Sequence, residues 1–204
     1  MKEERKIKFD TKFIVRAGIF SAFAALLYIF VKFPLPIFPG FLEIHLDEVP
    51  VFIASFAYGP FLGFIVLLIK TLIKLPFTST MCVGELADFI YSSVFIIPAA
   101  IIYNRNRKFK SVLIGFAVGT FLQLVVSLFF NVYIMIPFYS KVFGIDENGL
   151  LAIAQAANPN VRNIKWSLGF YAILPFNALK DAMVILITLP TYKSLHGLID
   201  KIKM

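Results

Sequence analysis

The sequence predicts an all-α integral membrane protein that forms one domain over residues 1–204, with six transmembrane helices and both termini in the cytoplasm. Composition is the first reason. Hydrophobic residues make up 59% of the chain and the mean hydropathy is +0.84, more apolar surface than a soluble domain of this length can bury. The second reason is that six apolar segments can be separated along the chain. The third is that lysine and arginine gather in alternate connections between those segments.

The first apolar segment, about 12–32, follows the charged stretch 1–16 and is predicted to be a retained helix. A cleaved signal peptide has a shorter apolar core and ends in small residues. This segment ends instead in Phe33-Pro34-Leu35-Pro36.

The second and third segments, about 47–58 and 61–75, are shorter than the ~20 residues of a perpendicular span. They are therefore either tilted helices or partly buried helices joined by a tight turn at Gly59-Pro60. Asp47 is expected to cap the second helix through its side chain, with Pro50 in the first turn.

Three longer segments complete the prediction, at about 85–103, 111–137 and 166–192. The connections expected on the outer side are 33–46, 76–84 and 138–165. Within the last of these, Glu147-Asn148-Gly149 and Asn158-Pro159-Asn160 are predicted turns.

The distribution of basic residues supports this orientation. Residues 1–16, 104–110 and 193–204 together hold thirteen lysines and arginines, whereas the three outer connections hold three. Adding Lys32 and Lys74, at outer helix ends, changes the ratio to thirteen against five without reversing it. Cytoplasmic connections of membrane proteins carry the excess of basic residues, so both termini are expected inside.

Several classes of function lack support in the sequence. The single cysteine, Cys82, excludes an internal disulfide and is expected to be an inert loop thiol. The net charge of +8 sits in blocks beside apolar segments, which indicates membrane orientation rather than nucleic-acid binding. No phosphate-binding P-loop, His-Glu-x-x-His zinc motif or Gly-x-Ser-x-Gly nucleophile motif occurs, and no metal site is expected.

Polar residues inside the third and fourth segments need partners, because lipid makes an unpaired charge costly. Lys70 and Lys74 lie four residues apart, shortly before Glu85 and Asp88. A structural interpretation is that Lys70 pairs with an acid and Lys74 reaches the membrane interface. A functional alternative is that the outer carboxylates form an acid–base pair.

The fifth and sixth segments carry Asn131, Asn177, Lys180 and Asp181. Asn131 is compatible with a structural role, in which its amide bonds a neighbouring backbone. Helical spacing places Asn177 and Lys180 on one face, and a lysine in the middle of a span favours a functional role for that face.

Small residues recur at four-residue spacing in two segments, which allows close helix contacts in lipid. The fifth segment has such a pair in Gly115 and Gly119. The first segment has two rows, Gly18 with Ala22 and Ala17 with Ser21 and Ala25. Internal packing and a partner interface are both open for either segment.

The stretch FPLPIFPGFLEIHLDEVPVFIASFAYGP, starting at Phe33, resembles the riboflavin-specific substrate-binding subunit (S component) of energy-coupling factor transporters. The resemblance continues through VGELADF at 83–89, FNVYIMIPFY at 130–139 and ILPFNALKD at 173–181, and so covers nearly the whole chain. The proline-rich block and the Pro-Phe-Asn-x-x-Lys block together are fairly specific. The loop departs from the family pattern at His45, where relatives tend to carry an acid.

The resemblance implies a multi-pass protein of the bacterial cell membrane that captures riboflavin at the outer face and is not itself an enzyme. It implies partners that power uptake, namely a transmembrane coupling subunit and two ATP-hydrolysing subunits, and no cofactor of the chain's own. The implied partner interface is Ala17, Gly18, Ser21, Ala22 and Ala25. The implied riboflavin contacts are Phe41, Leu46, Asp47, Glu85, Asp88, Asn131, Asn177 and Lys180.

Three alternatives remain open. One is an S component for another vitamin, such as thiamine or biotin. Another is a small membrane enzyme that uses the outer carboxylates. The third is a secondary transporter in which Lys180 and Asp181 couple to protons.

Overall fold

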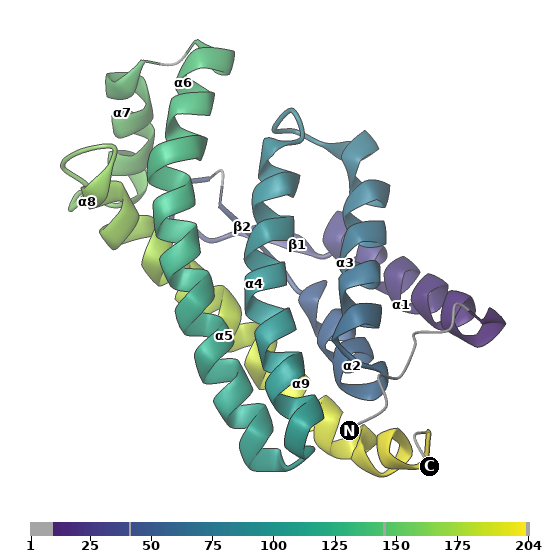
Figure 1. The fold of residues 1–204 in the computed structure, drawn as a ribbon. Coiled ribbons are helices and arrows are strands. Elements are labelled where there is room, and N and C mark those ends of the chain that lie inside the picture. The colour runs from purple at the N-terminus through teal and green to yellow at the C-terminus, as the bar shows by residue number, and fades with distance from the viewer. Residues whose placement is uncertain (1–9, 41, 145, 203–204) are drawn as a thin grey trace.

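The protein is described by a computed structural model covering residues 10–40, 42–144 and 146–202 (Figure 1). Nearly all of these residues are helical. The α-helices are α1 Thr11–Phe30, α2 Glu48–Tyr58, α3 Pro60–Lys74, α4 Val83–Asn106, α5 Phe109–Phe130, α6 Ile136–Phe143, α7 Glu147–Ala157, α8 Trp166–Leu168 and α9 Leu174–Ile202. A 3-10 turn (Leu75–Phe77), two π-helical segments (Asn131–Met135 and Gly169–Ile173) and two short strands (β1 Lys32–Pro34 and β2 Glu43–His45) complete the described elements.

Five helices in the described residues are long and apolar enough to cross a membrane. They are Thr11–Phe30, Pro60–Phe77, Val83–Asn106, Phe109–Val142 and Trp166–Ser194. In the last two, a π-helical segment joins two α-helices without a break in the helix. These spans agree with five of the six predicted segments, because each is a continuous apolar run that lipid surroundings favour as helix.

The predicted second segment is a short buried helix. Helix α2 has 11 residues, so it is about 16 Å long, roughly half the thickness of the hydrocarbon layer. Its residues from Pro50 to Ala57 are all buried. Gly59 ends α2 and precedes α3 with φ +106°, a conformation that favours glycine, and Pro60 starts α3.

The core is centred on the aromatic face of α2. The ring centroid of Phe52 lies 4.8 Å from that of Phe95 on α4 and 4.9 Å from that of Phe116 on α5. Phe56 meets Tyr103 at 4.8 Å. The two Phe52 pairs are edge-to-face and the Phe56 pair is tilted, and such aromatic contacts add to the stabilisation from burial.

Gly115 and Gly119 serve internal packing. A Cβ atom at Gly119 would lie 2.2 Å from the Phe95 carbonyl oxygen, and one at Gly115 would lie 2.9 Å from the Ala99 carbonyl oxygen. Glycine is therefore what allows α5 to lie against the backbone of α4.

The small residues of α1 divide between two faces. Ala17, Ser21 and Ala25 are buried inside the protein. Gly18 and Ala22 are exposed, and a Cβ atom at Gly18 would meet no atom within 4 Å. Only the second row is free to contact another protein.

Two of the three connections expected on the outer side contain strands or a helix of their own. In the first, β1 pairs antiparallel with β2, Lys32 opposite His45, and Lys32 forms an ion pair with Glu43 at 2.8 Å. In 138–165, the predicted turn at Glu147-Asn148-Gly149 is wrong, because it is the first turn of α7. The Asp146 side chain accepts a hydrogen bond from the Gly149 N–H at 2.8 Å and so caps that helix.

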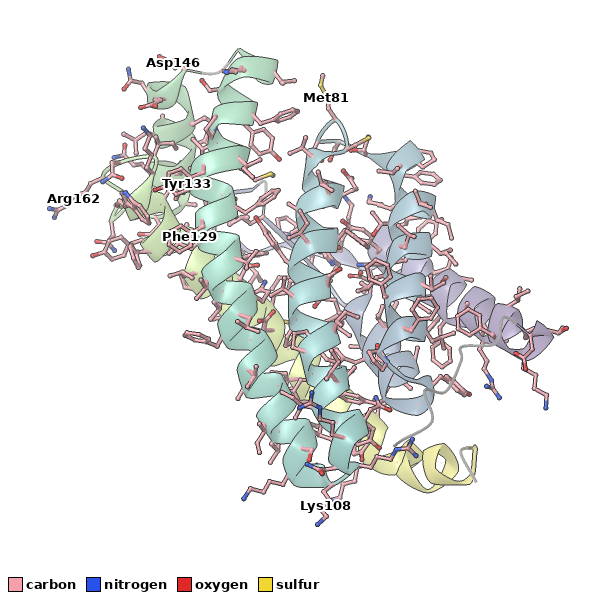
Figure 2. The ribbon with its side chains drawn as sticks, in the orientation of Figure 1. Met81, Lys108, Phe129, Tyr133, Asp146 and Arg162 are labelled. Atoms are coloured by element: carbon pink, nitrogen blue, oxygen red, sulfur yellow. The ribbon has the colours of Figure 1, made fainter. Side chains whose placement is uncertain are left out.

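The connections lie at two opposite ends of the helices. Lys108, between α4 and α5, is at one end, whereas Met81 and Asp146 are at the other (Figure 2). Figure 1 shows α9 crossing behind α5 and α4 toward the end where Lys108 lies.

Candidate functional site

A cavity of about 550 Å³ lies between the first connection, α4, α6, α7 and α9. Its lining includes Thr80, Leu150 and Ile153, so it lies toward the end of the molecule marked by Met81 and Asp146. This volume is in the range of sites that bind small molecules.

Aromatic and aliphatic side chains form much of the wall. Tyr28, Tyr91, Tyr139 and Phe176 all line the cavity. Tyr91 packs edge-to-face against Phe130 at 5.7 Å, and Phe176 against Phe38 at 5.4 Å. These contacts hold the rings in place and leave their other surfaces for a ligand.

The two π-helical segments shape the wall where α5 and α9 approach it. In each, the backbone N–H after the segment bonds a carbonyl five residues back, from Ile136 to Asn131 and from Leu174 to Gly169. Asn131 and Ile173 from these segments line the cavity. A proline follows each segment and cannot donate a helical hydrogen bond, which accounts for the local rearrangement.

The carbonyl that Pro175 cannot bond has another partner. Four residues before Pro175, the Tyr171 carbonyl accepts from the Asn158 side chain at 2.9 Å. This bond ties the end of α7 to the segment that leads into α9.

A network of buried charges lies at the base of the cavity. Lys70 donates to Asp47 and, at 2.9 Å, to Asp88. Lys180 donates to the other Asp88 oxygen at 3.0 Å and lies 3.1 Å from Glu48. Each carboxylate therefore has a cation, which is the condition for keeping such charges out of water.

His45 and Ser92 complete this network. His45 Nδ1 bonds Asp47, and its Nε2 lies 3.5 Å from an Asp88 oxygen. Ser92 donates to Glu48 at 2.6 Å. His45, Asp47 and Asp88 are grouped closely enough to hold a metal ion, but the Lys70 ammonium already bridges the two aspartates and supplies the positive charge there.

Two expectations about these residues are wrong. Asp47 stands at the N-cap position of α2 but makes no side-chain capping bond, because its carboxylate turns to Lys70 and His45 instead. Lys74 is buried and lines the cavity rather than extending to the protein surface. Its ammonium donates to the Phe77 carbonyl at 3.3 Å and lies over the Tyr28 ring.

Hydrogen bonds hold the polar groups of the wall in fixed orientations. Asn131 donates to the Tyr91 hydroxyl and to the Ser127 carbonyl, both at 2.8 Å. Asn177 donates to the Ile173 carbonyl at 2.9 Å and accepts from Gln123 at 3.0 Å. Glu85 accepts from the Thr78 and Thr80 hydroxyls at 2.7 and 2.9 Å.

The structure brings together most of the residues named from the sequence. Glu85, Asp88, Asn131, Asn177 and Lys180 all line the cavity. Leu46 packs against the main core, and Asp47 lies behind the wall. Phe41 lies outside the described residues.

Sequence reasoning did not assign cavity positions to Tyr28, His45, Tyr139 or Phe176. Tyr28 lies in an apolar helix whose sequence has no other sign of a ligand-binding site, and Phe176 is one of 24 phenylalanines. The Pro-Phe-Asn motif contains Phe176 beside Asn177, and is the one local signal that could have found it.

The fold and the cavity together define a class. Helices long and apolar enough to cross a membrane, arranged around an amphipathic cavity at one end, are typical of a membrane protein that binds a small molecule.

The sequence comparisons give the family. The model of the family "ECF transporter, substrate-specific component" matches residues 12–192, and the chain belongs to this family. The chain is 30% identical over 203 residues to the riboflavin transporter RibU of Staphylococcus aureus, covering 99% of this chain and 100% of that protein. It is 25% identical to the riboflavin transporter FmnP of Bacillus subtilis, covering 86% and 87%.

A solved structure agrees with this placement. The S component of a bacterial ECF transporter superimposes with a TM-score of 0.71 and 26% identity, covering 92% of this chain and 96% of the other.

Proposed function

We propose that this chain captures riboflavin at the outer face of the bacterial cytoplasmic membrane for ATP-driven uptake. The observation that carries the proposal is the cavity of about 550 Å³ with tyrosine and phenylalanine walls, two oriented asparagines and two lysines, Lys74 and Lys180. The similarity to riboflavin transporters along nearly the whole chain supports the choice of vitamin.

The chemistry of riboflavin matches these groups. Its ring system is flat and apolar on both faces, which suits contact with Tyr91, Tyr139 or Phe176. Its ring edge and ribityl chain carry donors and acceptors, which suit the Asn131 amide and the Lys180 ammonium. A ligand that left such groups unpaired would lose ~1–3 kcal/mol for each, and this is the basis for selectivity.

The orientation belongs to the same proposal. Both termini and Lys108 face the cytoplasm, and the end with Met81 and Asp146 faces outward, in line with the excess of basic residues in the inner connections. Helix α2 counts as a sixth membrane-embedded helix that is covered by the other five.

The chain has no enzymatic step and no cofactor of its own in this scheme. It assembles with a transmembrane coupling subunit and two ATP-hydrolysing subunits. The exposed row Gly18 and Ala22 on α1 is the surface proposed to meet the coupling subunit, because residues this small allow two helices to approach closely.

Purification in detergent tests riboflavin binding directly. Riboflavin should either co-purify, giving a yellow protein, or lose its fluorescence when added to the protein. A colourless protein that leaves riboflavin fluorescence unchanged would contradict the proposal. Thiamine and biotin serve as competitors, and displacement of riboflavin by either would point to another vitamin.

Reconstitution separates capture from transport. Vesicles that hold this chain alone should bind riboflavin but accumulate none, with or without an ion gradient. Uptake driven by a gradient would indicate a secondary transporter, and chemical conversion of the ligand would indicate an enzyme.

A further inference from the structure

Lys180 and Asp181 are neighbours on α9 but face different surroundings. Lys180 lines the cavity. Asp181 does not, and its side chain is buried where α9 packs against α2 and α5, with 1% of its surface exposed. Neither carboxylate oxygen of Asp181 has a hydrogen-bond partner among the described residues.

Other acceptors around Asp181 also lack donors. Glu48 on α2 bonds Lys180 and Ser92 through one oxygen, while its second oxygen has no partner in the described part of the chain. On α5, Gln123 bonds Asn177 of α9 through its amide nitrogen, but its side-chain oxygen has no hydrogen-bond partner in the described part of the chain. The Thr120 hydroxyl on α5 is one donor beside Asp181, but the free acceptors of α2, α5 and α9 outnumber it, so this contact needs a further hydrogen-bond donor.

The charges around Asp181 also disfavour an ionised carboxylate at this position. The charged groups that act on it are Glu48 from α2 and Lys180 from α9, while α5 contributes the uncharged Thr120 hydroxyl. On α4, Ser92 bonds Glu48 and Asp88 bonds Lys180. Lys180 is already bound to two carboxylates, so an ionised Asp181 would be a third negative charge at membrane depth with Glu48 beside it.

We propose that Asp181 is a neutral carboxylic acid whose O–H donates a hydrogen bond to the free oxygen of Glu48. One proton then supplies the missing donor and removes the surplus negative charge. The hydrogen bond from Asp181 fixes the orientation of the Glu48 carboxylate, so that its other oxygen faces Lys180. The Lys180 ammonium is thereby kept in its position at the cavity wall. Asp181 is thus a positioning residue for Lys180, and its effect on affinity rests on the proposed riboflavin site.

Infrared spectroscopy of the ligand-free protein in detergent tests the protonation without any ligand. The wild type should show the C=O stretch of a protonated carboxylic acid at neutral pH, shifted in D₂O and absent in Asp181→Asn. Asp10→Asn, which removes an exposed carboxylate, should keep the band. A wild type without this band, or an Asp181→Asn variant that retains it, would overturn the proposal.

Riboflavin titration tests the positioning role. Asparagine at 181 keeps an N–H donor, so its affinity should stay within about twofold of the wild type. Leucine has a similar shape without a donor, so Asp181→Leu should weaken binding by about fivefold or more. Equal affinities in both variants would refute the donor role.

The outcomes of the two experiments are independent of each other. If the wild type binds no riboflavin, the proposed function fails, while the infrared band still decides the state of Asp181. If Asp181→Leu does not fold, the wild type and Asp181→Asn are sufficient for the infrared test.

Discussion

Replacing Lys70 with methionine should destabilise this protein more than replacing any surface lysine with methionine. The Lys70 side chain is fully buried, and its ammonium binds Asp47 and Asp88 at the base of the cavity without lining it. Methionine has a similar length but no charge, so both aspartates lose this cation while they remain buried. Breaking a buried ion pair from one side costs about 3–5 kcal/mol.

Thermal unfolding in detergent, followed by loss of the monomer peak in size-exclusion chromatography, measures this effect. A loss of about 3–5 kcal/mol corresponds to a fall in midpoint of about 6–20 °C for a chain of this size. Lys32→Met is the matched control, because Lys32 forms its ion pair with Glu43 at the surface, where both side chains are about one-third exposed. Such a pair contributes at most about 1 kcal/mol.

The comparison can refute the reasoning in two ways. Lys70→Met could lower the midpoint no more than Lys32→Met, in which case the buried network does not stabilise the fold. Adding Asp47→Asn to Lys70→Met should recover part of the loss, since it removes one of the stranded charges. A double variant that is less stable than the single one would also contradict the argument.

Lys180→Met should weaken riboflavin binding by roughly 10- to 100-fold, because hydrogen bonds to charged groups contribute about 1.5–3 kcal/mol; Lys108→Met, at the opposite end, should bind like the wild type in the same fluorescence titration. Gly119→Ala should cost about 1–3 kcal/mol of stability, because the new Cβ meets the Phe95 carbonyl, while Gly18→Ala should cost almost nothing. Equal unfolding midpoints for these two alanine variants would show that α5 can move away from α4. Gly18→Leu should leave riboflavin binding intact and prevent co-purification with the coupling subunit; a variant that still assembles would remove this row of α1 from the interface.

The sequence was sufficient wherever the controlling interaction is local. Five long apolar runs predicted five spans, because each residue in lipid must satisfy its backbone within its own helix. Helical spacing placed Asn177 and Lys180 on one face, and both line the same cavity. The proline and Pro-Phe-Asn motifs supplied the family.

The tertiary structure decided which partner each polar or small residue meets. Lys180 bonds Asp88 from 92 residues away, and no local pattern specifies that pair. Asp47 has the sequence of a helix cap, but Lys70 and His45 compete for its carboxylate and make the stronger bonds in a buried site. In the same way, Gly119 and Gly18 belong to similar motifs, yet one faces a neighbouring backbone and the other faces outward. The sequence alone therefore determined which residues form the long apolar helices. Only the packing of these helices determined which residues line the cavity, because charge pairing and close contact depend on segments far apart in the chain.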